Sequence, residues 1–113
     1  RTMMGVKPVQ VVETFLPLGV SAIGANCGTT LENMEAIIKE YANTAPGIAL
    51  WAKPNAGMPK INDAGDTVFD VQPEKMGEFS LKYISAGARI VGGCCGNTPD
   101  HIAAISTAVR KRN

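Results

Sequence analysis

The sequence predicts an α/β fold in which parallel strands are joined by crossover helices. Along the 113 residues, short apolar runs alternate with stretches of helical periodicity, an order typical of parallel sheets. The apolar runs show no polar alternation, which indicates strands covered on both faces. The length, residues 1–113, is that of one small domain.

The N-terminal part predicts the end of a strand, a helix and a second strand. Met3–Gly5 is interpreted as the tail of a strand. Pro8–Leu18 follows as a helix, because proline suits a helix start and Gly19 a helix end. The inward face of this helix is expected to comprise Val9, Val12, Phe15 and Leu16. Val20–Ala25 is bounded by glycines and predicts a buried strand.

The middle of the chain predicts a helix, a strand and a long loop. Thr29 and Glu32 have capping-box spacing. The apolar stripe of the helix that follows is Leu31, Met34, Ile37, Ile38 and Tyr41. Ile48–Ala52 is the next expected strand. Residues 55–72, rich in Gly, Pro, Asn and Asp, predict a loop of a length that tends to be functional.

The last third predicts a helix, a strand and a final helix. The first helix starts at Pro73 and ends before Gly87. Its inward residues are expected to be Met76, Phe79 and Tyr83. Ala88–Val91 then reads as a strand and Gly92–Asn97 as a turn. Thr98 and Pro99 suit the start of the final helix, whose apolar stripe is Ile102, Ile105 and Val109.

Charge and hydropathy exclude several functions. Lys plus Arg total 11 against 10 for Asp plus Glu, a net charge of +1, so we expect no nucleic-acid partner. The one basic cluster, Arg110–Arg112, suits a helix C-terminus. No apolar run approaches the roughly 18 residues of a membrane span. Free thiols and the absence of a signal peptide lead us to expect a cytoplasmic protein.

The three cysteines are expected to converge. Cys27 follows one predicted strand, and Cys94 and Cys95 follow another; parallel strands end at one edge of a sheet, where α/β proteins place their sites. The glycines around Cys94 and Cys95 let the backbone turn both side chains toward one ion. Three thiolates leave one zinc position open, as in catalytic sites. Cysteines that merely pack at a strand end are the alternative, and spacing alone does not decide.

Other candidates carry weaker signals. His101, in the first turn of the last helix, is expected to be exposed, and Lys53 either faces the site or lies on its rim. Residues 92–98 resemble a phosphate-binding loop before a helix but lack the Gly-Lys-Ser/Thr ending. They define an alternative function: a flavodoxin-like phosphate-binding domain with no metal and inert cysteines. The carboxylates of the long loop are expected to be solvated: Asp63, Asp66 and Asp70.

Three motifs resemble the homocysteine S-methyltransferase family. They are Gly24–Gly28, Lys53–Pro59 and Gly92–Ile102, in the family's order and spread over most of the chain. The closest likeness is to the homocysteine-binding module of cobalamin-dependent methionine synthases. The resemblance implies a (β/α)₈ barrel and a methyltransferase of methionine biosynthesis.

The resemblance also implies a site. In the family a zinc ion is held by three cysteines, which match Cys27, Cys94 and Cys95 here. Homocysteine binds the open zinc position through sulfur and accepts a methyl group to give methionine. Asn26 and Asn55 match positions at the substrate, and Asn55 matches an occupant of the fourth zinc position when homocysteine is absent. In methionine synthases methylcobalamin, on another module, supplies the methyl group from methyltetrahydrofolate, whereas other relatives use betaine or S-methylmethionine.

The chain departs from the family in extent. A full barrel needs about 250 residues, and residues 1–113 resemble only its last three strand–helix units with the helix before them. The strands that would hold the amino-acid end of homocysteine are not in this sequence, so we expect the fragment alone to be inactive. Exposed strand edges and apolar patches favour pairing. We therefore expect self-association or binding of the missing part of the barrel. The resemblance does not identify the methyl donor.

Overall fold

A three-stranded parallel sheet forms the centre of the molecule, as predicted. The computed structural model describes residues 1–28 and 30–112. The strands lie in the order β1 (Ala22–Cys27), β2 (Ala49–Pro54), β5 (Ile90–Val91). β1 and β2 pair along their whole length, from Ala22 opposite Ala49 to Cys27 opposite Pro54. All three strands therefore end at the same edge of the sheet.

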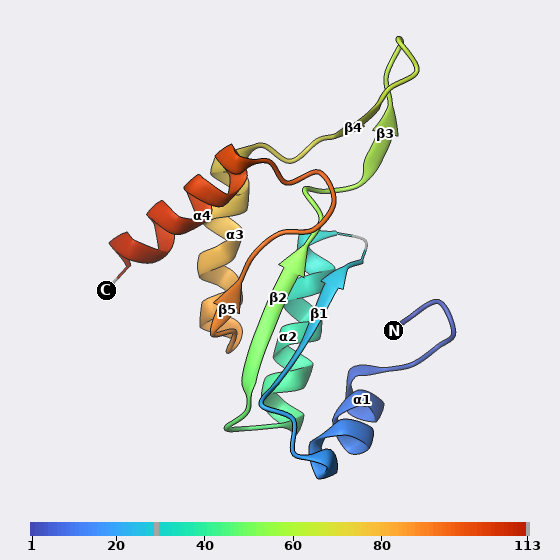
Figure 1. The fold of residues 1–113 in the computed structure, drawn as a ribbon, viewed down its shortest axis with the longest axis vertical. Helices are drawn as coiled ribbons and strands as arrows, with labels where there is room; N and C mark the ends of the chain where they lie inside the picture. Colours follow the sequence, from blue (N-terminus) through green and yellow to red (C-terminus); the bar gives the residue numbers. More distant parts are fainter. Residues whose placement is uncertain (29, 113) are drawn as a thin grey trace.

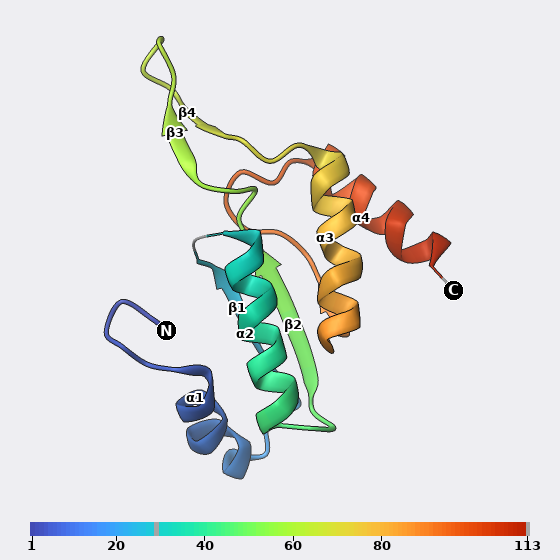
Figure 2. The same ribbon diagram turned by 180° about the vertical axis from the view of Figure 1, so that it is seen from behind.

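Helices connect the strands and cover one face of the sheet. The helices are α1 (Pro8–Phe15), continued by the 3₁₀ turn η1 (Leu16–Leu18), then α2 (Leu31–Thr44), α3 (Pro73–Ala86) and α4 (Pro99–Lys111). α2 lies behind β1 and β2 in Figure 1 and in front of them in Figure 2, with α3 beside it and α4 packed along α3. None of the helices in the described part of the chain is long and apolar enough to cross a membrane.

The expectation that both faces of the strands are covered is wrong for this chain. Leu50 and Ala52 point toward the helices and are 2% and 0% exposed, whereas Trp51 between them is 44% exposed. Ile90, beside Trp51 on β5, is 39% exposed. Side chains alternate between the faces of a strand, and the helices reach only one face. The second face stays open, and it carries the apolar Trp51 and Ile90 as well as the polar Asn26 and Lys53.

The core lies between the sheet and the helices. The predicted stripe of α2 is confirmed, since Leu31, Met34, Ile38 and Tyr41 are buried. The Tyr83 hydroxyl of α3 donates a hydrogen bond to the Leu31 carbonyl over 3.0 Å and so joins the two helices. α2 begins after Thr30, whose hydroxyl accepts from the Asn33 amide. The cap predicted at Thr29 lies outside the described residues.

The N-terminal predictions are only partly confirmed. Met3–Gly5 forms a turn and not a strand end. The helix predicted over Pro8–Leu18 ends at Phe15 and tightens into η1, because Pro17 lacks the N–H that an α-helix needs. Of the predicted inward face only Val12 is buried. The other three residues are exposed in this chain: Val9, Phe15 and Leu16.

The long loop predicted over residues 55–72 contains a β-hairpin. β3 (Pro59–Ile61) pairs antiparallel with β4 (Thr67–Phe69), and the hairpin stands beyond the edge where β1 and β2 end (Figure 1). Strands this short, among turn residues, leave no periodicity to recognise. Asp70 forms an ion pair with Lys60 over 3.1 Å, and this contact lowers the pKa of the Asp70 carboxyl.

His101 is buried, so the prediction of an exposed side chain is wrong. It is 8% exposed, and its Nε2 lies 2.7 Å from the Val71 carbonyl. The amide of Thr98 donates to Nδ1 over 3.2 Å, which leaves Nε2 as the donor to Val71. The imidazole thus ties the start of α4 to the segment before α3.

Candidate metal centre

The structure brings the three cysteine thiols together. Cys27 is the last residue of β1, and Cys94 and Cys95 lie in the loop after β5. Their Sγ atoms all lie within 4.8 Å of one another. The common carboxyl edge of parallel strands is thus enough to collect side chains that are 67 residues apart in the sequence.

Unusual backbone conformations direct these side chains. Cys27 has a φ of 57°, the one positive φ at a non-glycine residue in the described part of the chain. Such a conformation is costly without glycine and often marks a functional position. Gly96, after the cysteine pair, has a φ of 81°. The Phe69 ring of the hairpin occupies the place that a Gly96 side chain would need, so the hairpin packs directly on this loop.

Hydrogen bonds fasten the cysteine loop to the end of β2. The Cys94 amide donates to the Pro54 carbonyl over 2.8 Å, and the Cys95 amide donates to Asn55 Oδ1 over 3.0 Å. Asn97 Nδ2 donates to the Pro54 carbonyl over 3.0 Å and to the Cys94 carbonyl over 3.3 Å. Asn97 is predicted from the sequence only as part of a turn and not as a residue of the site. Its position directly after the Cys-Cys-Gly turn is the one available signal.

The three sulfur atoms lie close enough together for one tetrahedral zinc ion to gather them. Zn–S bonds of about 2.3 Å place the thiolates of a tetrahedral site ~3.8 Å apart. Here the Sγ atoms of Cys27 and Cys94 are 2.7 Å apart, and those of Cys94 and Cys95 are 4.0 Å apart. The separation of Cys94 and Cys95 is close to the required one, whereas Cys27 and Cys94 would have to move apart by about 1 Å to bind the same ion. Soft thiolate donors are also the ligands that zinc prefers in such sites.

The thiols share their protons unequally. The sulfurs of Cys27 and Cys94 share a hydrogen bond in which either thiol can donate, and this contact raises the pKa of Cys27 to about 11 and lowers the pKa of Cys94 to about 7. Asn26 Nδ2 lies 3.4 Å from the sulfur of Cys27 and 3.9 Å from that of Cys94, and its hydrogen bond also lowers the pKa of Cys94. Of these two thiols, Cys94 is therefore the one that ionises more readily.

Asn26 and Asn55, the two asparagines predicted at the substrate, lie at the thiol cluster. Asn26 directs its amide nitrogen toward the thiols. Asn55 uses its oxygen for the Cys95 amide, and its Nδ2 lies 3.5 Å from the Gly28 carbonyl. Asn55 thus connects the loop after β1 with the loop after β5. Its side-chain oxygen accepts its hydrogen bond from the backbone of Cys95, one of the three candidate ligands.

A parallel sheet with a three-thiol cluster at its carboxyl edge defines an α/β protein with a candidate metal site. The chain belongs to the homocysteine S-methyltransferase family, whose family model matches residues 1–109.

Three similar proteins illustrate this membership. A methionine synthase of Mycobacterium leprae is 38% identical over 98 residues, which cover 86% of this chain and 8% of the synthase. Homocysteine S-methyltransferase 2 of Saccharomyces cerevisiae is 34% identical over 94 residues, 80% of this chain and 28% of that protein. The crystal structure of the oxidized form of the homocysteine methyltransferase MmuM from Escherichia coli matches with a TM-score of 0.69 and 27% identity.

The match to MmuM covers 91% of this chain and 30% of that chain. The chain therefore spans less than a third of the length of each of these three proteins.

Proposed function

We propose that this chain is the zinc-binding part of a homocysteine S-methyltransferase. The observation that carries the proposal is the cluster of Cys27, Cys94 and Cys95 sulfurs within 4.8 Å at the carboxyl edge of the sheet. Cys27, Cys94 and Cys95 would hold the zinc ion, which would act as a Lewis acid and keep a substrate thiol ionised at neutral pH. The homocysteine sulfur then forms a bond to the methyl carbon, and the bond from that carbon to the donor breaks with its electron pair leaving on the donor.

We further propose that the chain supplies the last three strand–helix units of a (β/α)₈ barrel. The open sheet face and the coverage of 30% of MmuM support this placement. A substrate thiol would then enter from the carboxyl edge, where the Asn26 amide is placed to donate to sulfur. The donor belongs to another module or protein, and methylcobalamin is one candidate, because the three motifs resemble cobalamin-dependent methionine synthases. The free thiols favour a cytoplasmic location.

A phosphate-binding domain, the alternative from the sequence, receives no support from the loop after β5. A phosphate site there would need free amide groups. The amides of Cys94 and Cys95 already donate to Pro54 and Asn55, and the Asn97 amide donates to the Cys94 carbonyl. The glycines of this loop instead allow its backbone to turn.

Homocysteine is expected to bind the zinc-loaded chain through its thiol, and methionine is not. Isothermal titration calorimetry with the two amino acids tests this, because a thioether cannot ionise.

We propose that Asn55 fills the fourth zinc position when no thiol is present. Asn55→Ala should therefore weaken zinc binding without homocysteine more than with it. An equal loss of zinc affinity with and without homocysteine would show that Asn55 does not bind zinc and acts only through its hydrogen bond with Cys95.

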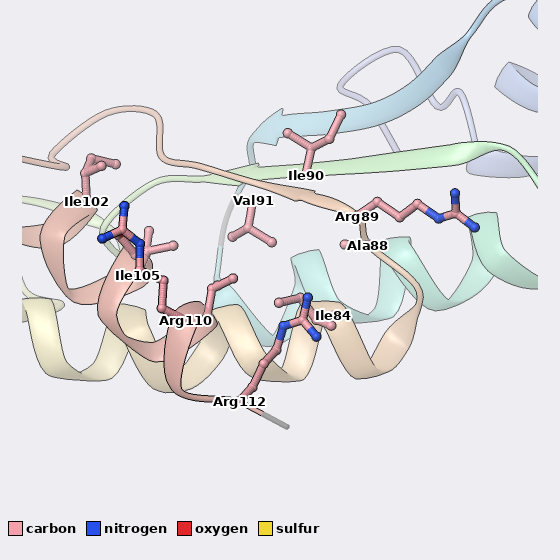
Figure 3. Close-up of a pocket in the computed structure, with 11 residues that line it drawn as sticks. Ile84, Ala88, Arg89, Ile90, Val91, Ile102, Ile105, Arg110 and Arg112 are labelled. Atoms are coloured by element: carbon pink, nitrogen blue, oxygen red, sulfur yellow. The ribbon is translucent and has the colours of Figure 1, made fainter.

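A hollow beside β5, in addition to the open face of the sheet, favours contact with another polypeptide segment. A hollow of about 570 Å³ lies between β5, α3 and α4. Figure 3 shows its apolar wall, with Ile84, Val91 and Ile105 facing the space and Arg110 and Arg112 at the rim. β5 pairs with β2 on one side only, so its second edge runs beside this hollow. We propose that the remaining strands of the barrel cover both.

Without those strands the chain is expected to self-associate at micromolar concentration, because an open edge and an apolar face pair readily. Light scattering should give a mass above that of the monomer. Ile90→Lys, which charges the open face, should lower this mass. Leu81→Lys is the matched control, since Leu81 on α3 is similarly exposed at 37%. A monodisperse wild-type monomer would contradict the prediction.

A further inference from the structure

His101, in the first turn of α4 after the cysteine loop, uses both ring nitrogens for backbone groups. Nε2 lies 2.7 Å from the Val71 carbonyl, and Nδ1 accepts from the Thr98 amide over 3.2 Å. The group of candidate metal ligands found among the described residues consists of the three cysteines. The buried imidazole therefore has a role other than coordination of the ion.

A series of hydrogen bonds leads from His101 to the backbone of Cys95. The Val71 carbonyl accepts from His101, and the Val71 amide donates to the Ala56 carbonyl over 3.1 Å. The Ala56 amide in turn donates to the Cys95 carbonyl over 2.9 Å. Ala56, Val71 and His101 are all buried, so water has little access to compete for these bonds.

The polypeptide chain closes these hydrogen bonds into a ring. The turn after Cys95 leads directly to Thr98, whose amide donates to His101 Nδ1. Strand pairing does not hold Cys95, because β5 already ends at Val91. The position of its backbone depends instead on hydrogen bonds such as the one from Ala56. The imidazole is the side chain that joins the two ends of the ring.

We propose that His101 is a positioning residue that holds the Cys95 thiol in place for the metal. The inference rests on the proposed function, because it assumes that the three sulfurs share one ion. Cys27 is fixed by its place in β1, whereas Cys95 is exposed and lies in a loop. Groups that orient metal ligands from outside the coordination shell contribute strongly to metal affinity. His101 does so through the backbone, because without it the Val71 carbonyl loses its partner and the ring opens.

Cobalt(II) binding by two variants tests the inference, because cobalt occupies zinc sites and its absorption reports thiolate ligands. His101→Asn keeps an acceptor for the Thr98 amide but is too short to reach Val71. It should bind cobalt about 10-fold more weakly, the lower end of the range for groups that orient metal ligands. Its thiolate-to-cobalt absorption at saturation should also be weaker. His101→Gln supplies both an acceptor and a donor and suits the third helix position of a capping box, so it should restore the affinity and the spectrum.

The controls separate positioning from a general loss of stability. Ile38→Val removes a methylene group from a fully buried side chain of α2; it should lower the urea midpoint but keep the cobalt affinity and spectrum of wild type. Circular dichroism should show that all three variants retain their helices. Wild-type affinity and spectrum in His101→Asn, or an equal change in Ile38→Val, would overturn the role of His101 alone. A wild-type chain that binds no cobalt would overturn the proposed function, and this inference with it.

Discussion

Replacing any one of the three cysteines by alanine is expected to abolish stoichiometric zinc binding. The sulfurs of Cys27, Cys94 and Cys95 form one cluster, and two thiolates cannot complete the site. Loss of an outer hydrogen-bonding partner already costs roughly 10- to 100-fold in metal affinity, so loss of a ligand should cost more. Zinc content after gel filtration, measured for each variant by atomic absorption, checks the prediction.

Two comparisons make this result specific to the ligand set. Ser85→Ala, at an exposed residue near the end of α3, should retain the zinc content of wild type. Circular dichroism should show that each cysteine variant keeps its helices, since the thiols lie at the sheet edge and outside the core. If all three alanine variants kept one zinc per chain, the assigned ligands would be wrong.

Gly24→Ala is expected to destabilise the sheet strongly. Gly24 lies opposite Trp51 in the β1–β2 pair. A Cβ at Gly24 would clash with the main-chain oxygen of Trp51 and approach the Trp51 Cβ to 2.8 Å. Backbone atoms of a paired strand cannot move aside without breaking the pairing. We expect a loss of about 1–3 kcal/mol in the free energy of unfolding, the usual range for overpacking.

Gly92→Ala is the matched control for this prediction. Gly92 follows β5 on the same open face, and its nearest neighbour would be the flexible stem of Lys53 at 3.4 Å. This distance is an ordinary van der Waals contact, so the variant should unfold close to wild type in urea. Equal urea midpoints for Gly24→Ala and wild type would show that β1 and β2 are not packed as described.

The elements that follow a clear period were predictable from the sequence. The apolar stripe of α2 and the proline and glycine at the ends of α3 place these helices correctly. The hairpin of β3 and β4 was missed, because its six residues are too few for a period and turn residues surround them. The expected burial of Phe15 and Leu16 failed for another reason. Helical periodicity shows which face is apolar, but nothing in it shows whether this chain contains the surface that covers that face.

Part of the candidate site was also predictable. Cys27 and Cys94 could be placed together because the rule for parallel strands needs only the order of strands and helices. The supporting contacts could not be predicted. Asn97 bonds to the Pro54 carbonyl, and Phe69 packs on Gly96. Both contacts depend on how three loops meet in space, and His101 was misjudged because its partner, the Val71 carbonyl, is a backbone group without a sequence signal.

The metal content of the purified chain, combined with thiol titration before and after chelation, tests the proposed zinc centre most directly. The assembled cluster of Cys27, Cys94 and Cys95 predicts about one zinc per chain and three thiols that react only after the chelator removes the metal. A chain that contains no zinc after growth in zinc-supplemented medium, with three thiols reactive from the start, would contradict it.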